Sequence, residues 1–470
     1  MMSVLSSLIV VLPALLASAL NVNKEHASDS AGNRYTVVLH RQRVPVRSDD
    51  AFVSFKSIYF GNIHLGGPKS QTFSMVFDSG SGHLIVPSTA CLSETCAIHR
   101  RFDSNLSTTA IETDMDGNPI KPHGARDHIT VAFGTGEVTG SFVQDRVCLN
   151  FPDEPSDANV AMASNPEADA PEASMLERYG ERHGCVDLRI VAATDMAEEP
   201  FASFSFDGVL GLGLGSLALS PEFSFFEMMT RQANLARPIF GVFLADNDDD
   251  FSEIDFGGFN PERVTSEIKW APVAIPEFGY WQVKITAVRV GNRTFDFCND
   301  GQCRAVVDTG TSLLAVPGAF AQELQDSLES SLSDGQAGRP DCKSATGEIL
   351  EFDFEGGTLT LNPGDYARPA INLAGTTEDE ESQIVEAAVE AGDRGEPLDP
   401  KLTKCHPTIM PIEMPEPVGP KLFIWGEPVL RKYYTAYDWQ NKMVGFALAA
   451  QMEAAAPAEV QPEVTPLLFL

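Results

Sequence analysis

The sequence repeats one 15-residue pattern, once in each half of the chain. SMVFDSGSGHLIVPS at 74–88 returns as RAVVDTGTSLLAVPG at 304–318. Each copy has an apolar pair, an aspartate, Ser or Thr, a glycine, Ser or Thr, and then an apolar run closed by proline. An apolar-apolar-glycine element follows each copy, VLG at 209–211 and IWG at 424–426. The repeat predicts two similar lobes, each of which contributes one aspartate.

Strand-like segments surround both copies of the repeat. Short β-branched and aromatic runs broken by glycine and proline recur, as in ITVAFGTGEVTGSF at 129–142 and YWQVKITAVRVGN at 280–292. This pattern is typical of antiparallel strands and turns. Helical spacing is sparse, with 224–236 and 319–332 as the best candidates. We therefore expect a mostly β protein.

Composition limits what the chain can bind. With 470 residues and 43% hydrophobic content, the chain can bury substantial cores. Its formal net charge is -33, and a strongly acidic chain repels the phosphate backbone of nucleic acids. We therefore expect no nucleic-acid partner. No CxxC knuckle is present, so we expect neither a metal site nor a cofactor.

The N-terminus has the features of a secretory signal. MMSVLSSLIVVLPALLASAL is apolar and ends near an A-S-A site, which predicts a signal peptide over 1–19. No Lys or Arg precedes the apolar run, so a buried or membrane-anchoring helix is the alternative. No other segment approaches the length of a membrane span, and we expect no transmembrane segment in the mature chain.

The eight cysteines are interpreted as four disulfides, because an exported chain folds in an oxidising compartment. Two pairs of neighbouring cysteines close short loops. Among the other four, the simplest pairing joins Cys342 to Cys405, which leaves Cys148 to pair with Cys185. The predicted pairs are Cys91–Cys96, Cys298–Cys303, Cys342–Cys405 and Cys148–Cys185. Two sequons, at Asn105 and Asn292, permit glycosylation of an exported chain.

Two acidic segments that are poor in aromatic residues interrupt the strand pattern, at 152–183 and 375–400. Their composition favours mobile surface insertions. The tail over 450–470 has the composition of a disordered segment. The remaining chain divides into an N-terminal lobe over 51–240 and a C-terminal lobe over 241–449.

From Tyr59 to Ala449 the sequence resembles the pepsin-like aspartic proteases of the A1 family. Besides the two aspartate motifs, it contains YFGNIHLGG, FGTGEVTG at the flap position, FDGVLGLG, GYWQV and YYTAYDWQNKMVGFA. The resemblance implies a mostly β, bilobal acid-protease fold with an active-site cleft between two β-lobes. It also implies a monomeric aspartic endopeptidase that hydrolyses polypeptides at acidic pH, either outside the cell or in a vacuole or lysosome-like compartment.

The basic region 20–50 lies where a zymogen of this family carries its prosegment. It is short, and it lacks lysine over 34–47. The sequence leaves open whether this region is removed or stays as an edge strand.

Two neighbouring aspartates suit peptide hydrolysis for a physical reason. Carboxyls that lie close together cannot both ionise cheaply, so the pair keeps one proton. The ionised partner can take a proton from an attacking water while the protonated partner hydrogen-bonds the developing oxyanion. Asp78 and Asp308 are the predicted catalytic pair. Gly80 and Gly310 allow the tight turns that present backbone N–H groups to the carboxylates.

The resemblance assigns roles to the neighbouring hydroxyls. Ser79 and Thr309 are expected to hydrogen-bond across the lobe interface. Ser81 and Thr311 are expected to hydrogen-bond the outer carboxylate oxygens.

The flap departs from the family pattern. Phe133, followed by Gly134 and Thr135, replaces the usual flap tyrosine, and Ile85 replaces the usual tryptophan that bonds it. Losing both partners together leaves no orphan polar group. The departure is interpreted as divergence, with an altered S1 wall and a more mobile flap as the alternative.

The sequence leaves two alternative functions, a serine hydrolase and a binding module. A nucleophilic Ser79 or Ser81 would need a histidine base, and His64 and His83, which flank the turn, are expected to be solvated. This alternative also leaves the second motif unexplained. A non-catalytic peptide- or protein-binding module on the same fold would be expected to have lost an aspartate or its glycine, and both motifs are intact.

Overall fold

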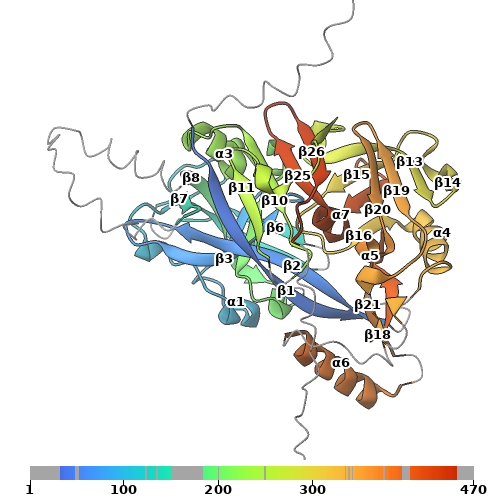
Figure 1. The fold of residues 1–470 in the computed structure, drawn as a ribbon. Helices are drawn as coiled ribbons and strands as arrows, with labels where there is room; N and C mark the ends of the chain where they lie inside the picture. Colours follow the sequence, from blue (N-terminus) through green and yellow to red (C-terminus); the bar gives the residue numbers. More distant parts are fainter. Residues whose placement is uncertain are drawn as a thin grey trace, which may run out of the picture.

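The computed structural model describes residues 32–47, 52–121, 124–133, 136–150, 184–199, 201–247, 250–333, 335–336, 339–340, 342–373, 376–393 and 403–452. These residues form two large sheets and a few short helices, and Figure 1 shows two strand-rich halves side by side. The predicted mostly β, bilobal fold is confirmed. Among the described residues, no helix combines the length and apolar character needed to cross a membrane.

The larger sheet has 16 strands, and its main path runs β12-β26-β25-β10-β11-β1-β2-β3-β9-β4-β8-β7-β5. Its strands are β1 (Tyr35–Arg47), β2 (Phe52–Leu65), β3 (Gln71–Asp78), β4 (Leu84–Pro87), β5 (Ile111–Thr113), β6 (His128–Phe133), β7 (Gly136–Cys148), β8 (Cys185–Met196), β9 (Gly208–Gly211), β10 (Ile239–Phe243), β11 (Ser252–Phe256), β12 (Lys269–Pro272), β21 (Ala367–Asn372), β22 (Thr403–Pro407), β25 (Tyr433–Asp438) and β26 (Met443–Leu448). The expected lobe boundary at 240/241 falls inside β10, so this sheet contains strands from both halves of the chain.

The second sheet has eight strands and belongs to the C-terminal half. Its strands are β13 (Gln282–Val290), β14 (Arg293–Phe295), β15 (Arg304–Val307), β16 (Leu314–Pro317), β19 (Leu350–Phe354), β20 (Gly357–Leu361), β23 (Ile409–Ile412) and β24 (Leu422–Trp425), and a separate pair is formed by β17 (Gly335–Gln336) and β18 (Arg339–Pro340). The α-helices are α1 (Glu94–Ile98), α3 (Phe225–Gln232), α4 (Gly318–Glu329), α5 (Pro363–Tyr366), α6 (Glu378–Asp393) and α7 (Glu427–Lys432). Both predicted helices are present, as α3 and α4.

The sequence repeat folds into the same strand arrangement twice. β9 pairs parallel with β3 and antiparallel with β4, so it lies between them. β24 does the same between β15 and β16. Glycine is required where these middle strands meet the turns, because a Cβ on Gly426 would lie 2.2 Å from the Thr311 carbonyl oxygen, and one on Gly211 would lie 2.5 Å from the His83 nitrogen. The apolar-apolar-glycine elements thus bring each aspartate turn against the core of its half.

β1 is an internal strand of the larger sheet. Its first part pairs with β11 and its second part pairs with β2, so both of its edges are used. Tyr35, Val37 and Leu39 are buried, and Thr36 Oγ1 donates to Asp255 Oδ1 at 2.6 Å. Only residues 48–51 separate β1 from β2, so the chain that follows β1 offers no other segment to take its place. We therefore expect β1 to be retained in the mature protein.

The acidic segment 375–400 contains a helix that its composition did not predict. α6 places Ile384, Val385 and Ala388 against Ile371 of β21 and Phe55 of β2. These three positions follow the i, i+1, i+4 spacing of one helix face. The apolar face anchors α6, while Glu380 and Glu386 are exposed. The insertion 152–183, the signal segment 1–19 and residues 453–470 of the tail lie outside the described residues.

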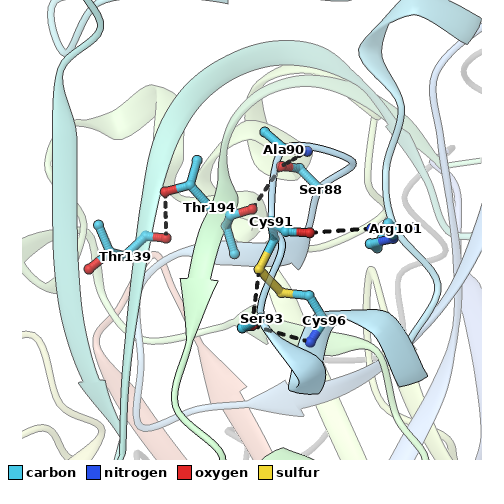
Figure 2. Close-up of a disulfide and its surroundings, with 9 residues drawn as sticks. Ser88, Ala90, Cys91, Ser93, Cys96, Arg101, Thr139 and Thr194 are labelled. Atoms are coloured by element: carbon cyan, nitrogen blue, oxygen red, sulfur yellow. Dashed lines mark hydrogen bonds between the residues drawn. A yellow bond between two sulfur atoms is a disulfide. The ribbon is translucent and has the colours of Figure 1, made fainter.

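The structure forms the four disulfides that the sequence predicts. Figure 2 shows Cys91–Cys96, which closes the loop after the first aspartate motif. Ser93 caps the short helix in this loop by accepting from the Cys96 N–H, and Arg101 donates to the Cys91 carbonyl. Cys148–Cys185 joins paired positions of β7 and β8 and closes off the insertion between these strands.

Removal of β1 should abolish stable folding. A chain that begins at residue 48 would leave the edges of β11 and β2 unpaired and lose the four buried side chains of β1, which contribute on the order of 5–10 kcal/mol. N-terminal sequencing of active protein should find the chain starting before Arg34. Active enzyme whose chain begins after Arg47 would contradict this prediction.

Candidate active site

The two aspartates occupy equivalent positions in the two halves of the molecule. Asp78 is the last residue of β3, and Asp308 follows the last residue of β15. Each accepts a hydrogen bond from the glycine two residues later: Gly80 N–H to Asp78 Oδ1 and Gly310 N–H to Asp308 Oδ1, both at 2.9 Å. The turn therefore orients each carboxylate by the same backbone contact.

Hydrogen bonds between the two turns cross from one half of the molecule to the other. Ser79 N–H donates to Thr309 Oγ1 at 2.9 Å, and Thr309 N–H donates to Ser79 Oγ at 3.0 Å. Ser79 Oγ donates to the Val307 carbonyl at 2.8 Å, and Thr309 Oγ1 donates to the Phe77 carbonyl at 2.5 Å. The structure thus has the reciprocal contact that the sequence predicts for these two hydroxyls. These hydrogen bonds fix the separation of the two carboxylates.

Glycine allows the two carboxylates to approach one another. A Cβ on Gly310 would lie 2.5 Å from Asp78 Oδ1 and 3.4 Å from Asp308 Oδ1, so these oxygens are close neighbours. A Cβ on Gly80 would lie 2.9 Å from Asp308 Oδ1. Each turn therefore leaves space for the carboxylate of the opposite turn.

The two carboxylates differ in their outer contacts. Thr311 Oγ1 donates to Asp308 Oδ2 at 2.6 Å, as predicted. The matching contact at Asp78 is weaker: the buried Ser81 Oγ makes no hydrogen bond of good geometry, although it lies close enough to Asp78 to affect the pKa of that carboxyl. Burial first, and then the charge of Asp308, raise the pKa of Asp78 well above its usual range, although the nearby Ser81 hydroxyl opposes the shift. Burial and the neighbouring charge therefore oppose ionisation of both carboxyls at once.

Three aromatic residues surround the turns, and the sequence assigned none of them a role. Tyr280 lies near the dyad. Burial first, and then the charges of Asp308 and Asp78, raise the pKa of its phenol. Trp281 is buried and donates its indole N–H to the Leu212 carbonyl at 2.8 Å. Tyr437 is buried against Trp281, with ring centroids 5.4 Å apart. The motifs GYWQV and YYTAYDW could have indicated these residues, because a buried indole or phenol needs a polar partner.

The two histidines beside the first turn are buried, so the prediction that they are solvated is wrong. His64 lies with Nδ1 3.0 Å from Thr72 Oγ1. His83 Nε2 accepts from a backbone N–H. Neither contact reaches a serine of the turn: Ser79 Oγ bonds residues of the opposite half, and Ser81 Oγ has no described partner. The geometry does not support a histidine-activated serine.

The flap position is a β-hairpin of β6 and β7, which pair up to Phe133 and Gly136. Gly134, Thr135 and the side chain of Phe133 lie outside the described parts of the structure. Ile85 is buried in a cluster that includes residues of β7 and β8, and Ile129 and Val131 of β6 pack against it. The base of the hairpin therefore rests on the cluster that contains Ile85, and contact between Ile85 and Phe133 stays a prediction.

Two similar β-lobes that present one aspartate each define an aspartic protease of the pepsin type. The model of the eukaryotic aspartyl protease family matches residues 58–151 and 185–379 of this chain. The chain is 31% identical to cathepsin E of Rattus norvegicus over 399 residues, 83% of this chain and 80% of that protein. It is 30% identical to vacuolar protease A of Neurospora crassa over 392 residues, 83% of this chain and 78% of that protein. The chain belongs to the eukaryotic aspartyl protease family, and it is an aspartic endopeptidase.

Replacing Gly310 with alanine should impair catalysis without unfolding the protein. The added Cβ would push Asp78 away from its position, and a displacement of about 1 Å can cost roughly 100-fold in rate. The measurement is kcat/KM on a peptide substrate together with the unfolding temperature. Gly67→Ala is the control, because its Cβ would meet Thr109 at an ordinary 3.6 Å. Equal activity in the two variants would show that Gly310 does not set the spacing of the carboxylates.

Proposed function

We propose that Asp78 and Asp308 are the catalytic pair and that they hydrolyse peptide bonds of extended polypeptides by activating water, with an optimum at acidic pH. One observation carries this proposal. The reciprocal bonds of Ser79 and Thr309 hold the two carboxylates together from opposite halves of the molecule. The raised pKa of Asp78 supports a singly protonated pair.

The mechanism uses the difference between the two carboxylates. Asp308, which accepts donors from Gly310 and Thr311, acts as the base and takes a proton from water as its oxygen bonds to the peptide carbon. Asp78 donates its proton toward the carbonyl oxygen, where negative charge develops. The tetrahedral intermediate then collapses: the C–N bond breaks and the amine leaves with the proton that Asp308 took from water. One hydroxyl of the intermediate returns its proton to Asp78 as the carboxylic acid product forms, so the dyad again holds one proton.

The substrate lies extended between the lobes, with the hairpin of β6 and β7 closing over it. Backbone hydrogen bonds then provide most of the recognition, and apolar side chains are favoured on both sides of the cut bond. No observation favours the non-catalytic binding module, because both aspartates and both glycines occupy their expected positions.

The enzyme works in an acidic compartment of the secretory pathway or outside the cell. A relative whose name is vacuolar protease A supports the vacuolar form of this proposal. Asn105 and Asn292 are both exposed, which suits glycosylation during export. Endoglycosidase treatment and fractionation of the cells that make the protein test this part.

Asp78→Asn and Asp308→Asn should each reduce kcat by roughly 10²–10⁴-fold or more, because one carboxyl cannot serve as both acid and base. Both variants should fold, since an amide has nearly the same shape as a carboxyl. Activity is measured across pH on a denatured protein, with circular dichroism as the control for folding. Substantial turnover by either variant would overturn the assignment of the catalytic pair.

The free energy of unfolding of Asp78→Asn, relative to that of the wild type, should increase as pH rises. The pKa of Asp78 is raised in the folded protein, so the wild type loses stability as pH rises from the ordinary aspartate pKa near 4 through the raised value. Asparagine does not titrate, so the variant avoids this loss, which should exceed about 1 kcal/mol at pH 7. Urea unfolding at pH 4, 5.5 and 7 measures the difference. A constant difference across these pH values would contradict the raised pKa.

A further inference from the structure

The buried His83 connects the first aspartate turn to a neighbouring segment. His83 directly precedes β4, is 8% exposed, and packs edge-on against Phe223 with ring centroids 5.7 Å apart. Its Nε2 accepts the backbone N–H of Leu219 at 3.1 Å. Because Nε2 accepts, the ring proton of the neutral imidazole is on Nδ1.

The segment 213–219 lies between the Asp78 turn and the loop that carries Tyr280. Gly213 N–H donates to the Ser81 carbonyl, and Leu214 N–H donates to the Gly279 carbonyl, both at 2.8 Å. Gly279 directly precedes Tyr280, whose pKa responds to both catalytic aspartates. The segment therefore touches the Asp78 turn on one side and the Tyr280 loop on the other.

Two leucines of this segment differ in their surroundings. Leu217 packs closely on two glycines: a Cβ on Gly82 would lie 2.4 Å from the Leu217 carbonyl carbon, and one on Gly279 would lie 2.5 Å from Leu217 Cγ. Leu219 is 42% exposed, although the N–H of the same residue is bonded to His83. An exposed leucine whose backbone is fixed by a buried group presents its side chain in a defined position.

We propose that His83 is a positioning residue: its unprotonated Nε2 holds segment 213–219 beside the dyad, where Leu217 and Leu219 contact apolar side chains of the substrate. The proposal rests on the catalytic assignment of Asp78 and Asp308. It adds a residue that touches neither the substrate nor the reacting atoms and acts on substrate binding through Leu219.

Protonation of His83 would break this contact. A proton on Nε2 would face the Leu219 N–H, and two donors cannot bond each other. Burial lowers the pKa of His83 to about 4, and burial is the only cause of the shift. The titratable and charged side chains on the surrounding elements are Asp78 on its own turn, Glu222 on η5 (Pro221–Phe223), Arg189 on β8 and Glu227 on α3. As pH falls through about 4, the segment loses its anchor and substrate binding weakens.

The test is the pH dependence of KM and kcat for one apolar peptide between pH 3 and 6. In the wild type, KM should rise as pH falls below about 4. His83→Gln keeps an acceptor near the Nε2 position and does not titrate, so this rise should disappear. His83→Phe keeps the packing and loses the acceptor, so its KM should be raised roughly three- to tenfold at every pH. The matched control is His64→Gln, a buried histidine on β2, which should follow the wild-type profile.

The outcomes separate the two proposals. If His83→Gln retains the acid rise in KM, or if His83→Phe binds substrate as the wild type does, the role of His83 is wrong while the catalytic pair stands. If Asp78→Asn remains active, the catalytic pair is wrong, whatever the histidine variants show. Imidazole ¹⁵N spectra of the wild type give a second measurement that needs no stable variant: His83 should keep its proton on Nδ1 at pH 5.5 and titrate near 4. Titration near the ordinary histidine pKa of about 6.5 would overturn the proposal.

Discussion

The reciprocal hydrogen bonds between Ser79 and Thr309 are the constraint on which the rest of the site depends. Two carboxyls repel one another when both are ionised, so an external frame must hold them together. Four bonds provide it, because each hydroxyl also donates to the carbonyl that precedes the opposite aspartate. The frame works only if the two turns can meet closely, which is why glycine follows each Ser or Thr.

The resemblance to the pepsin-like proteases predicted this frame, because it supplied the roles of the two hydroxyls across the lobe interface. The two aspartates and their glycines were visible in the repeat itself. Ser81 matches its expected role less closely than Thr311 does. Its equivalent, Thr311, donates to Asp308, but the Ser81 hydroxyl has no described partner. Whether a hydroxyl reaches a carboxylate depends on rotamer and packing, which a sequence pattern does not specify.

Long-range packing accounts for the other differences between expectation and structure. Composition predicted a mobile acidic insertion at 375–400, where α6 lies. Acidic residues there outnumber the few apolar residues that anchor the helix to β2 and β21. The solvated state expected for His64 and His83 came from their position beside a turn, yet both rings are buried, and Phe223, distant in sequence, packs against His83. Neither the partner strands of β1 nor the neighbours of His83 could be identified before the topology was known.

Burial acts on the titratable groups of the site in opposite directions. Removing water favours the neutral form of every group, so it raises the pKa of Asp78 and lowers that of His83. It also raises the pKa of Asp255, which holds β1 through Thr36, to about 6. A folded-state pKa above the ordinary value means that stability is lost as pH rises, and both aspartates behave in this way. His83 loses its neutral form only in stronger acid. The same burial therefore keeps both ends of the site neutral over a wide range of pH: Asp78 holds its proton to a higher pH, and His83 stays unprotonated to a lower pH.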